Sequence, residues 1–237
     1  MKIIKPKIII EDLDYTKIMK NIEKACRTCY RSEDKITKDS YKTLLKNCIN
    51  RGHESVLEHE KITIQMICDI GVYKDLTRHR HASFSIESTR FCNYNKDKFD
   101  NQLHLIEPVF YENNWNEAIT LGSAISVDEQ KSYYWYDCMK NIEQTYNAMI
   151  ELGSIPDEAR MILPHSTAAT VTMTANIREW KHILELRCTK HAHPSVQQVM
   201  IPLLLYFKEK MPEIFNSIEY NKEFDKSKYA ELEIREL

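Results

Sequence analysis

The sequence predicts a mixed protein of helices and strands, of the α/β (α+β) class. Apolar residues in 61–70 alternate with mostly polar neighbours, which is the two-residue period of a half-buried strand. Apolar residues in 127–152 instead recur at three-and-four spacing, which indicates a long amphipathic helix. Both periods occur in a chain of 237 residues that is 43% hydrophobic, enough to fill the core of one large domain.

The first third of the chain is expected to alternate between strands and helices. In order, we expect a strand over 2–10, helices over 14–30 and 39–51, a strand over 61–70 and one or two helical turns over 72–79. Gly52 can adopt the left-handed conformation that ends helices. Gly71 is expected to break the strand that precedes it.

The middle of the chain is expected to be extended and then irregular. If residues 82–91 form a strand, Ser88 and Arg90 share a face, because alternate side chains of a strand point the same way. The polar stretch 98–126 is interpreted as a loop-rich insertion.

The second half is expected to be mainly helical. The elements predicted are a helix over 127–152 ended by Gly153, a short helix from Pro156 that stops before Pro164, a strand over 168–175, a helix from Asn176 to Cys188 and a helix from Pro194 kinked at Pro202. Asn176 and Glu179 have the spacing of a capping box, in which each side chain bonds the other residue's backbone N–H.

Composition argues for one domain over 1–218, followed by a charged tail over 219–237 that is expected to be poorly ordered. No run of about 18 apolar residues occurs, and the N-terminus lacks the apolar segment of a signal peptide, so we expect a cytoplasmic protein with no membrane partner. A net charge of −2 provides no general attraction for nucleic acid, which disfavours a dedicated nucleic-acid binder.

Cysteine and histidine patterns do not predict a metal site. The seven cysteines are odd in number and irregularly spaced, which fits free thiols in a reducing compartment. Cys26 and Cys29 have a zinc-like spacing, but both lie on an apolar helical stripe and no second pair completes four ligands, so core packing is preferred. His191 and His193 could join His79 and His81 around zinc, yet no typical ligand spacing supports this, and we expect no metal.

The segment 78–90 gathers arginines and hydroxyl side chains. Guanidinium groups keep their charge at neutral pH, so their repulsion is offset by an anion, and phosphate matches their planar fork. A solvated basic loop is the alternative. The chain has only four glycines and no Gly-x-Gly-x-x-Gly motif, so a bound dinucleotide would depend on side-chain donors.

Four motifs occur in a fixed order over residues 50–215. They are Gly52-His53-Glu54-Ser55 with Glu58-His59, Arg78-His79-Arg80 followed after seven residues by Ser88, Ala159-Arg160-Met161-Ile162-Leu163-Pro164, and Asn176-x-Arg178 running to Leu186-Arg187 and His191-Ala192. Together this set resembles the signature of the flavin-dependent thymidylate synthases.

The resemblance implies a catalytic domain with a central, mostly antiparallel sheet flanked by helices, assembled as a homotetramer with active sites shared between subunits. It implies reductive methylation of 2′-deoxyuridine 5′-monophosphate (dUMP) to the thymidine nucleotide (dTMP). Methylenetetrahydrofolate is the implied carbon donor, and FAD reduced by NADPH the implied hydride donor.

Residue roles follow from the same resemblance. Cofactor binding falls to Ser55, Glu58, Arg78, His79, Arg80, His81, Asn176, Arg178 and His182. Substrate binding falls to Glu87, Ser88, Arg90, Arg160 and Arg187, and catalysis to His53, Ser88 and Arg187. Ser88 is expected to orient the substrate, because no adjacent base is assured to activate it as a nucleophile. Without the resemblance, Arg178 and His182 fit a solvated helix face, and His53 fits a surface residue after a helix.

Four positions depart from the family pattern. Asp75 stands where glutamine is frequent, Ile86 where a polar residue is common, Phe91 where tyrosine is frequent, and His182 where asparagine is frequent. Two other classes of protein are alternatives: a nucleic-acid-binding module that stacks bases on Phe84 and Phe91, and a metal-dependent hydrolase built on the histidines.

Overall fold

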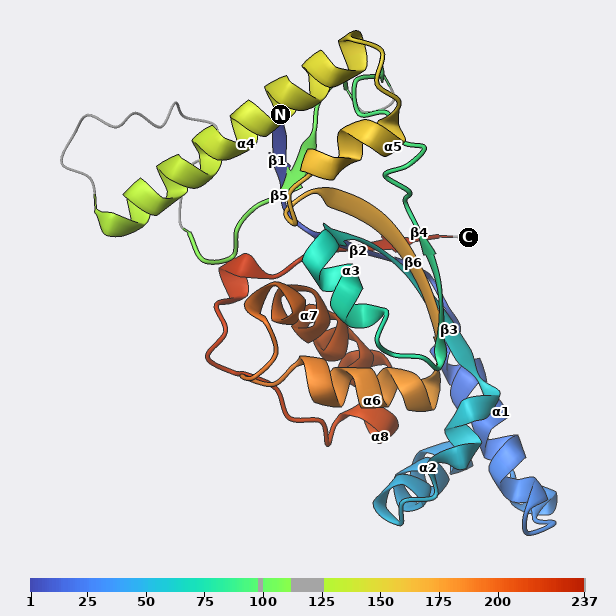
Figure 1. Ribbon diagram of the computed structural model, residues 1–237. Helices are drawn as coiled ribbons and strands as arrows, with labels where there is room; N and C mark the ends of the chain where they lie inside the picture. The colour runs from blue at the N-terminus through green and yellow to red at the C-terminus, as the bar shows by residue number, and fades with distance from the viewer. Residues whose placement is uncertain (98–99, 112–125, 237) are drawn as a thin grey trace.

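The computed structural model describes residues 1–97, 100–111 and 126–236. Its main sheet has five strands, in the spatial order β4 (Ala82–Ile86), β6 (Ala168–Asn176), β3 (Lys61–Asp69), β2 (Lys7–Glu11) and β7 (Glu231–Arg235). The pairs β4–β6, β6–β3 and β3–β2 are antiparallel, and β7 joins β2 in parallel. The expected class and the mostly antiparallel sheet flanked by helices are therefore confirmed (Figure 1).

The strand expected over 2–10 is in fact two strands in two sheets. β1 (Lys2–Ile4) pairs in parallel with β5 (His104–Ile106), whereas β2 joins the main sheet. Pro6 separates them, because proline has no N–H for a strand ladder. The Pro6 carbonyl instead accepts from the Glu231 N–H at 2.9 Å.

Helices α6 (Ile177–Arg187) and α7 (Pro194–Lys210) cover one face of the sheet (Figure 1). Trp180 lies fully buried between them and the sheet, and its indole N–H donates to the Ile62 carbonyl at 3.0 Å. Its ring packs edge-on against Phe207, with the ring centroids 6.1 Å apart. α7 continues through Pro202, and the four-residue helix α8 (Pro212–Phe215) follows it.

Helices α1 (Tyr15–Thr28) and α2 (Ser40–Asn50) pack together at one end of the molecule (Figure 1). α1 begins at Asp14, whose carboxylate accepts from the Lys17 N–H at 2.9 Å. Gly52 follows α2 with φ +71°, which confirms its expected left-handed conformation. Two 3-10 turns lie nearby, η1 (Glu33–Lys35) and η2 (Glu54–His59).

Gly71 does not act as a simple strand breaker. β3 ends at Asp69, whose side chain accepts from the Val72 N–H at 2.7 Å and caps helix α3 (Ile70–Leu76). Gly71 therefore lies in the first turn of that helix. A Cβ there would sit 3.0 Å from Asp69 Oδ1, so the close approach of the cap favours glycine.

The long helix α4 (Val127–Glu151) and the short helices α5 (Pro156–Ala159) and η4 (Arg160–Ile162) lie beyond one end of the main sheet (Figure 1). Ser126 and Glu129 form a capping box at the start of α4, and Gly153 follows its end with φ +100°. The short helices end before Pro164, as expected. Part of the predicted insertion over 98–126 lies outside the described residues, and its described part contains β5.

The C-terminal segment is ordered, contrary to the expectation of a poorly ordered tail. After the turn η5 (Lys226–Lys228), β7 pairs with five residues of β2, from Lys7↔Glu231 to Glu11↔Arg235. The exposed edge of β2 offers unpaired backbone groups, and a charged segment can bind them through its main chain.

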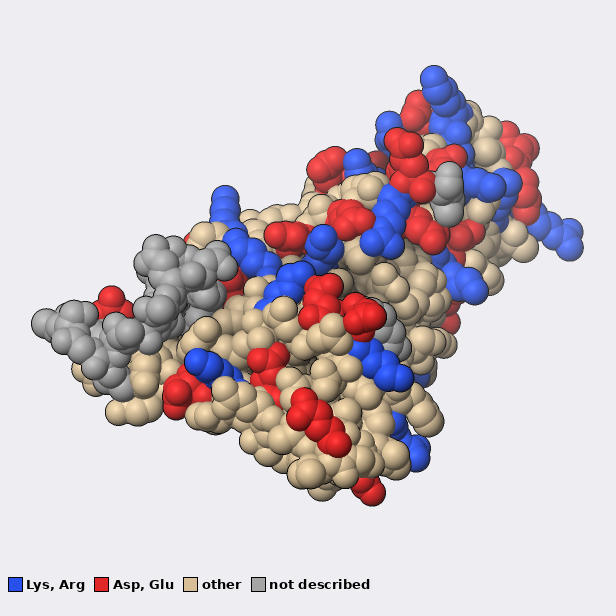
Figure 2. All heavy atoms as spheres, turned by 90° about the horizontal axis from the view of Figure 1, so that it is seen from above, with Lys and Arg blue, Asp and Glu red and all other residues tan. Residues whose placement is uncertain are grey.

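The sheet face opposite α6 and α7 is rich in hydroxyl groups. Thr63 and Thr174 bond across the β3–β6 pair at 2.8 Å, and Ser83 and Ser85 of β4 are exposed. Seen from above, acidic and basic side chains are interspersed (Figure 2).

Within the described residues, no helix has the length and apolar character needed to cross a bilayer.

Candidate active site

A polar groove of about 470 Å³ lies between η2, the start of β4 and α6. Five of the residues expected to bind the cofactor line it, namely Glu58, His81, Asn176, Arg178 and His182, together with Glu54, Glu179 and Glu185. Arg178 and His182 face the groove together because they lie one helical turn apart. The groove thus brings together residues from three of the sequence motifs.

Ion pairs line this groove. Arg178 pairs with Glu58, and this bond raises the pKa of the guanidinium group. Lys181 contacts both Glu54 and Glu185, and although burial lowers its pKa, these carboxylates reverse the effect and hold it protonated. Acidic side chains outnumber arginines on the lining, so the groove suits hydroxyl and amide groups better than a pyrophosphate.

The start of α6 is capped on one side only. The Asn176 side chain accepts from the Glu179 N–H at 2.8 Å, as expected. The second bond of the predicted capping box, from the Asn176 N–H to the Glu179 side chain, is not part of this cap. The Glu179 carboxylate instead lies 3.5 Å from Nδ1 of His79.

Arg187, the last residue of α6, is held by His79 and Asp75 from the chain that follows β3, and its Nη1 also lies 3.9 Å from Asp75 Oδ2. Its Nε–H donates to Nε2 of His79 at 3.0 Å, and its Nη2–H donates to the Asp75 carbonyl at 2.9 Å. Burial, and then the positive charge of Arg187, lower the pKa of His79 despite the nearby carboxylate of Glu179. The imidazole is therefore neutral at pH 7, and its Nε2 is free to accept.

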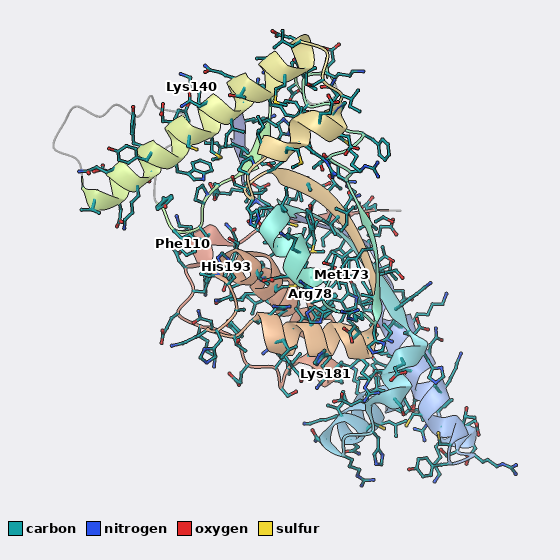
Figure 3. All side chains as sticks on the ribbon, viewed as in Figure 1. Arg78, Phe110, Lys140, Met173, Lys181 and His193 are labelled. Atoms are coloured by element: carbon teal, nitrogen blue, oxygen red, sulfur yellow. The ribbon has the colours of Figure 1, made fainter. Side chains whose placement is uncertain are left out.

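The three consecutive residues of the arginine motif point in different directions. His79 is only 6% exposed and does not line the groove. Its ring instead accepts from Arg187 inside the protein. Arg78 is exposed and lines a separate cavity of about 640 Å³, whose wall includes His193 and Phe110 (Figure 3). Arg80 is exposed, and no polar partner is recorded for it in the described part of the chain. Within one chain, Arg78 and Arg80 therefore do not line the groove.

His53 and Ser55 also lie apart from the groove. They line a cavity of about 300 Å³ together with Cys26 and Cys48, on the other side of η2 from Glu58. The Sγ atoms of Cys26 and Cys48 are 3.1 Å apart, and burial followed by this contact raises the pKa of Cys26 to about 12. Core packing is therefore confirmed for Cys26, and Cys48 is buried beside it, but the prediction is wrong for Cys29, which is exposed at the end of α1.

The substrate residues form a second cluster, and it is built on a turn. β4 ends at Ile86, and the Ser88 carbonyl accepts from the N–H groups of Phe91 and Cys92. The expectation that 82–91 is extended is therefore wrong beyond Glu87, and Ser88 and Arg90 do not share a strand face. The turn forms because Glu87 is the last residue of this segment bonded to β6, through Thr170.

Asp157 joins the two arginines of this cluster. Its carboxylate lies 3.3 Å from Arg90 Nε and 2.9 Å from Arg160 Nε. Glu87, which was expected to bind substrate, accepts from the Tyr94 hydroxyl at 3.2 Å and from the Thr170 N–H at 3.3 Å. Its carboxylate thus fixes the loop beside Arg90 in this chain.

The two clusters lie at opposite ends of β4. An extended chain rises about 3.3 Å per residue, so His81 and Ser88 are separated by roughly 20 Å. His81, Ser83 and Ser85 share the exposed, hydroxyl-rich face of the sheet, because they alternate with the packed residues of β4. Arg187 belongs to the groove end, and Arg90 and Arg160 to the other end.

Two acidic residues were missed as site residues by the sequence analysis. Glu179 was interpreted only as a capping residue, and Asp157 has no motif of its own. A carboxylate on the buried side of a helix, one position before Trp180, was the available signal for Glu179. Among the described residues, no three histidine, cysteine or acidic side chains are grouped so as to hold a metal ion.

Solved structures of other proteins share this fold. The chain superposes on a UMP/dUMP methylase, PolB from Streptomyces cacaoi bound with 5-Br dUMP, with a TM-score of 0.73, 19% identity and coverage of 91% of this chain and 96% of that one. For Thymidylate Synthase X (ThyX) from Helicobacter pylori with FAD and dUMP, the TM-score is 0.67 at 19% identity, covering 90% and 98%. At these identities the likeness establishes the fold alone.

Sequence comparison identifies the family. The family model described as thymidylate synthase complementing protein matches residues 13–213. The flavin-dependent thymidylate synthase of Thermosipho melanesiensis is 29% identical over 210 residues, which cover 88% of this chain and 90% of that protein. The enzyme of the same name from Corynebacterium diphtheriae is 28% identical over 208 residues, covering 84% and 78%. The chain belongs to this family of flavin-dependent thymidylate synthases, which confirms the resemblance.

Proposed function

We propose that this protein is an FAD-dependent thymidylate synthase that methylates dUMP to dTMP. Methylenetetrahydrofolate supplies the carbon and NADPH reduces the flavin. The observation that carries the proposal is the assembly of Glu58, His81, Asn176 and Arg178 into one groove. These residues come from motifs that are far apart in the sequence, and the fold joins them at the edge of an exposed sheet face.

The donor set of the groove fits the uncharged parts of FAD. Asn176 uses its side-chain oxygen for the helix cap, which leaves its amide N–H groups for a ligand. Arg178, His81 and His182 add further donors, and the carboxylate of Glu58 accepts from hydroxyl or amide groups. When bound, the flavin supplies hydride chemistry that protein side chains lack.

The pyrophosphate of FAD needs more positive charge than the single arginine of this groove, Arg178, provides. Arg78 lines a separate cavity and Arg80 is exposed, and neither side chain lines this groove in its own chain, so we assign both to the cofactor of a neighbouring subunit. Each truncation should remove a charge-assisted contact of about 1.5–3 kcal/mol.

The turn after β4 fits the phosphate of dUMP. Arg90 and Arg160 converge on Asp157, and Ser88 lies at the start of the same turn. A phosphate has the same preference for paired guanidinium groups as this carboxylate has. Ser88 orients the nucleotide there.

Arg187 is assigned to the uracil ring. C5 of uracil becomes nucleophilic when negative charge on the ring oxygens is stabilised, and a fixed guanidinium group can stabilise it. His53 is assigned to the folate side of the reaction. The reaction depends on positioning, because the carbon donor and the hydride donor must meet one face of the base.

The separation of the two clusters supports sites shared between subunits, as in the homotetramer that we propose. Arg187 and Ser88 lie at opposite ends of β4 within one chain, yet both are assigned to dUMP. A second subunit placed across the exposed sheet face would bring the groove end of its β4 next to the Ser88 end of β4 in this subunit. We infer a cytoplasmic enzyme that acts on small molecules and binds neither nucleic acid nor membrane.

Cofactor content and isotope release test this function. The purified protein should be yellow and should release FAD on denaturation in a ratio of about one per chain. It should release tritium from [5-³H]dUMP only when folate and NADPH are both present. A colourless protein that fails to take up added FAD would overturn the proposal, as would isotope release that does not require flavin.

A further inference from the structure

Glu179 is a buried carboxylate with a specific neighbour. It is 8% exposed, in the first turn of α6, and its own N–H is used by the Asn176 cap. A buried carboxylate needs a polar partner, because losing water without compensation is unfavourable. The His79 ring provides this partner, with Nδ1 at 3.5 Å from Glu179 Oε1.

This contact and the Arg187 bond together determine which ring nitrogen of His79 carries the proton. A neutral imidazole has one donor and one acceptor. Nε2 accepts from Arg187, so the proton must lie on Nδ1, where Glu179 can accept it. In the opposite tautomer, Nε2–H would face the Arg187 N–H, and Nδ1 would face a carboxylate without a proton between them.

The His79 ring in turn fixes the plane of the Arg187 guanidinium group. Its Nε–H is held by the ring, and one Nη2–H by the Asp75 carbonyl at 2.9 Å. A guanidinium group has five N–H donors, so the remaining ones keep a defined direction. The His182 ring, which lines the groove, packs edge-on against the His79 ring, with the ring centroids 5.9 Å apart.

We propose that Glu179 is a positioning residue of the reaction, which acts through the His79 imidazole to aim the guanidinium group of Arg187. The inference rests on the proposed function only for the role of Arg187. Glu179 need not touch the substrate, and its contribution should appear in turnover more than in flavin affinity. A misplacement of about 1 Å in a reacting site can reduce a rate on the order of a hundredfold.

Two substitutions separate this role from a purely structural one. Glu179→Gln keeps an oxygen that can accept from Nδ1–H, whereas Glu179→Leu has similar bulk and no acceptor. Glu209→Gln, an exposed change on α7, is the matched control. Turnover per bound flavin should fall roughly tenfold to a hundredfold in Glu179→Leu and stay within about threefold in Glu179→Gln.

The tautomer provides a readout that needs no activity. Solid-state NMR of ¹⁵N-histidine-labelled protein, with the His79 signals identified by their loss in His79→Gln, should show Nδ1 protonated in the parent and in Glu179→Gln. Glu179→Leu should show a mixture of tautomers. An unchanged tautomer in Glu179→Leu overturns the proposal, and so does full turnover per flavin in that variant. If the parent lacks flavin and activity but the tautomer responds as expected, the proposed function fails while the Glu179–His79 contact stands.

Discussion

The Asp157 carboxylate lies 3.3 Å from the Nε of Arg90, a residue 67 positions earlier in the chain. The contact ties the turn after β4 to helix α5, and Asp157 also contacts Arg160 at 2.9 Å. Two guanidinium groups thus share one carboxylate. The local excess of positive charge fits a phosphate that displaces or joins Asp157.

Asp157→Asn should therefore tighten dUMP binding. The substitution removes a negative charge that competes with the phosphate, and we expect the Kd for dUMP to fall about threefold to tenfold at low salt. Because the ion pairs are partly exposed, stability should change by less than about 1 kcal/mol. Isothermal titration at two salt concentrations provides the measurement. Asp128→Asn on α4 is the control, and weaker dUMP binding by Asp157→Asn would contradict the assignment.

Arg178→Gln should weaken FAD binding. The side chain donates within the groove, and loss of a charge-assisted contact predicts a Kd increase of roughly tenfold or more. Flavin fluorescence during titration measures this. Lys190→Gln, an exposed residue paired with Glu223, serves as the control. Equal affinity in the parent and Arg178→Gln would remove the groove from the flavin site.

Arg78→Ala and Arg80→Ala should also lower flavin occupancy, although neither side chain lines the groove of its own chain. If the two arginines act from a neighbouring subunit, the substitutions should lower the flavin occupancy of assembled tetramers more than that of separated chains. Light scattering combined with flavin absorbance tests this. A parent protein that is monomeric at micromolar concentration but retains full flavin would exclude shared sites.

The His79 pKa predicts a specific dependence of stability on pH. Because its folded pKa is lowered, the unfolded chain binds more protons below an ordinary histidine pKa of about 6.5. Stability due to His79 is therefore present above that pH and is lost as pH falls toward the folded pKa. One proton contributes a slope of at most about 1.4 kcal/mol per pH unit.

Urea unfolding of His79→Gln measures this contribution. The variant should lose less stability than the parent between pH 7 and pH 5.5. His104, whose pKa burial also lowers, remains in both proteins and maintains part of the slope. Identical slopes in the two proteins would show that His79 is not held neutral.

Removal of β7 should destabilise the protein. Five residues of β7 pair with β2, and each lost hydrogen bond contributes about 0.5–1.5 kcal/mol, so a loss of a few kcal/mol is expected. The unpaired edge of β2 should also promote association between chains. Urea midpoints of a chain ending at Ala230 and of one lacking only residues 236–237 give the comparison. Equal midpoints would mean that β7 adds no stability.

Periodicity predicted most of the fold. The strands of 61–70 and 168–175 and the helices of 14–30, 39–51 and 127–152 all form within about two residues of expectation, because their patterns reflect burial on one face. The failures involve long-range pairing. The pairing of β1 with β5, the strand β7 and the turn after Glu87 depend on partners distant in sequence, which local patterns do not contain.

The site was predictable in its residues more than in its geometry. Motif matching found Arg178, His182 and Arg187, and helix spacing correctly placed the first two together. It could not show that His79 is turned inward while Arg78 and Arg80 point outward. That arrangement depends on the turn after α3, where the His79 N–H bonds to the Leu76 carbonyl at 3.0 Å.

The position of β4 between the two clusters gives a physical reason for the fixed interval between Arg80 and Ser88. A strand has a fixed rise per residue, and its successive side chains point to opposite faces of the sheet. One inserted residue would turn His81, Ser83 and Ser85 inward or shift Ser88 and Arg90 by a full step. If the proposed sites are right, activity should therefore depend on the number of residues between Arg80 and Ser88 as well as on their identity.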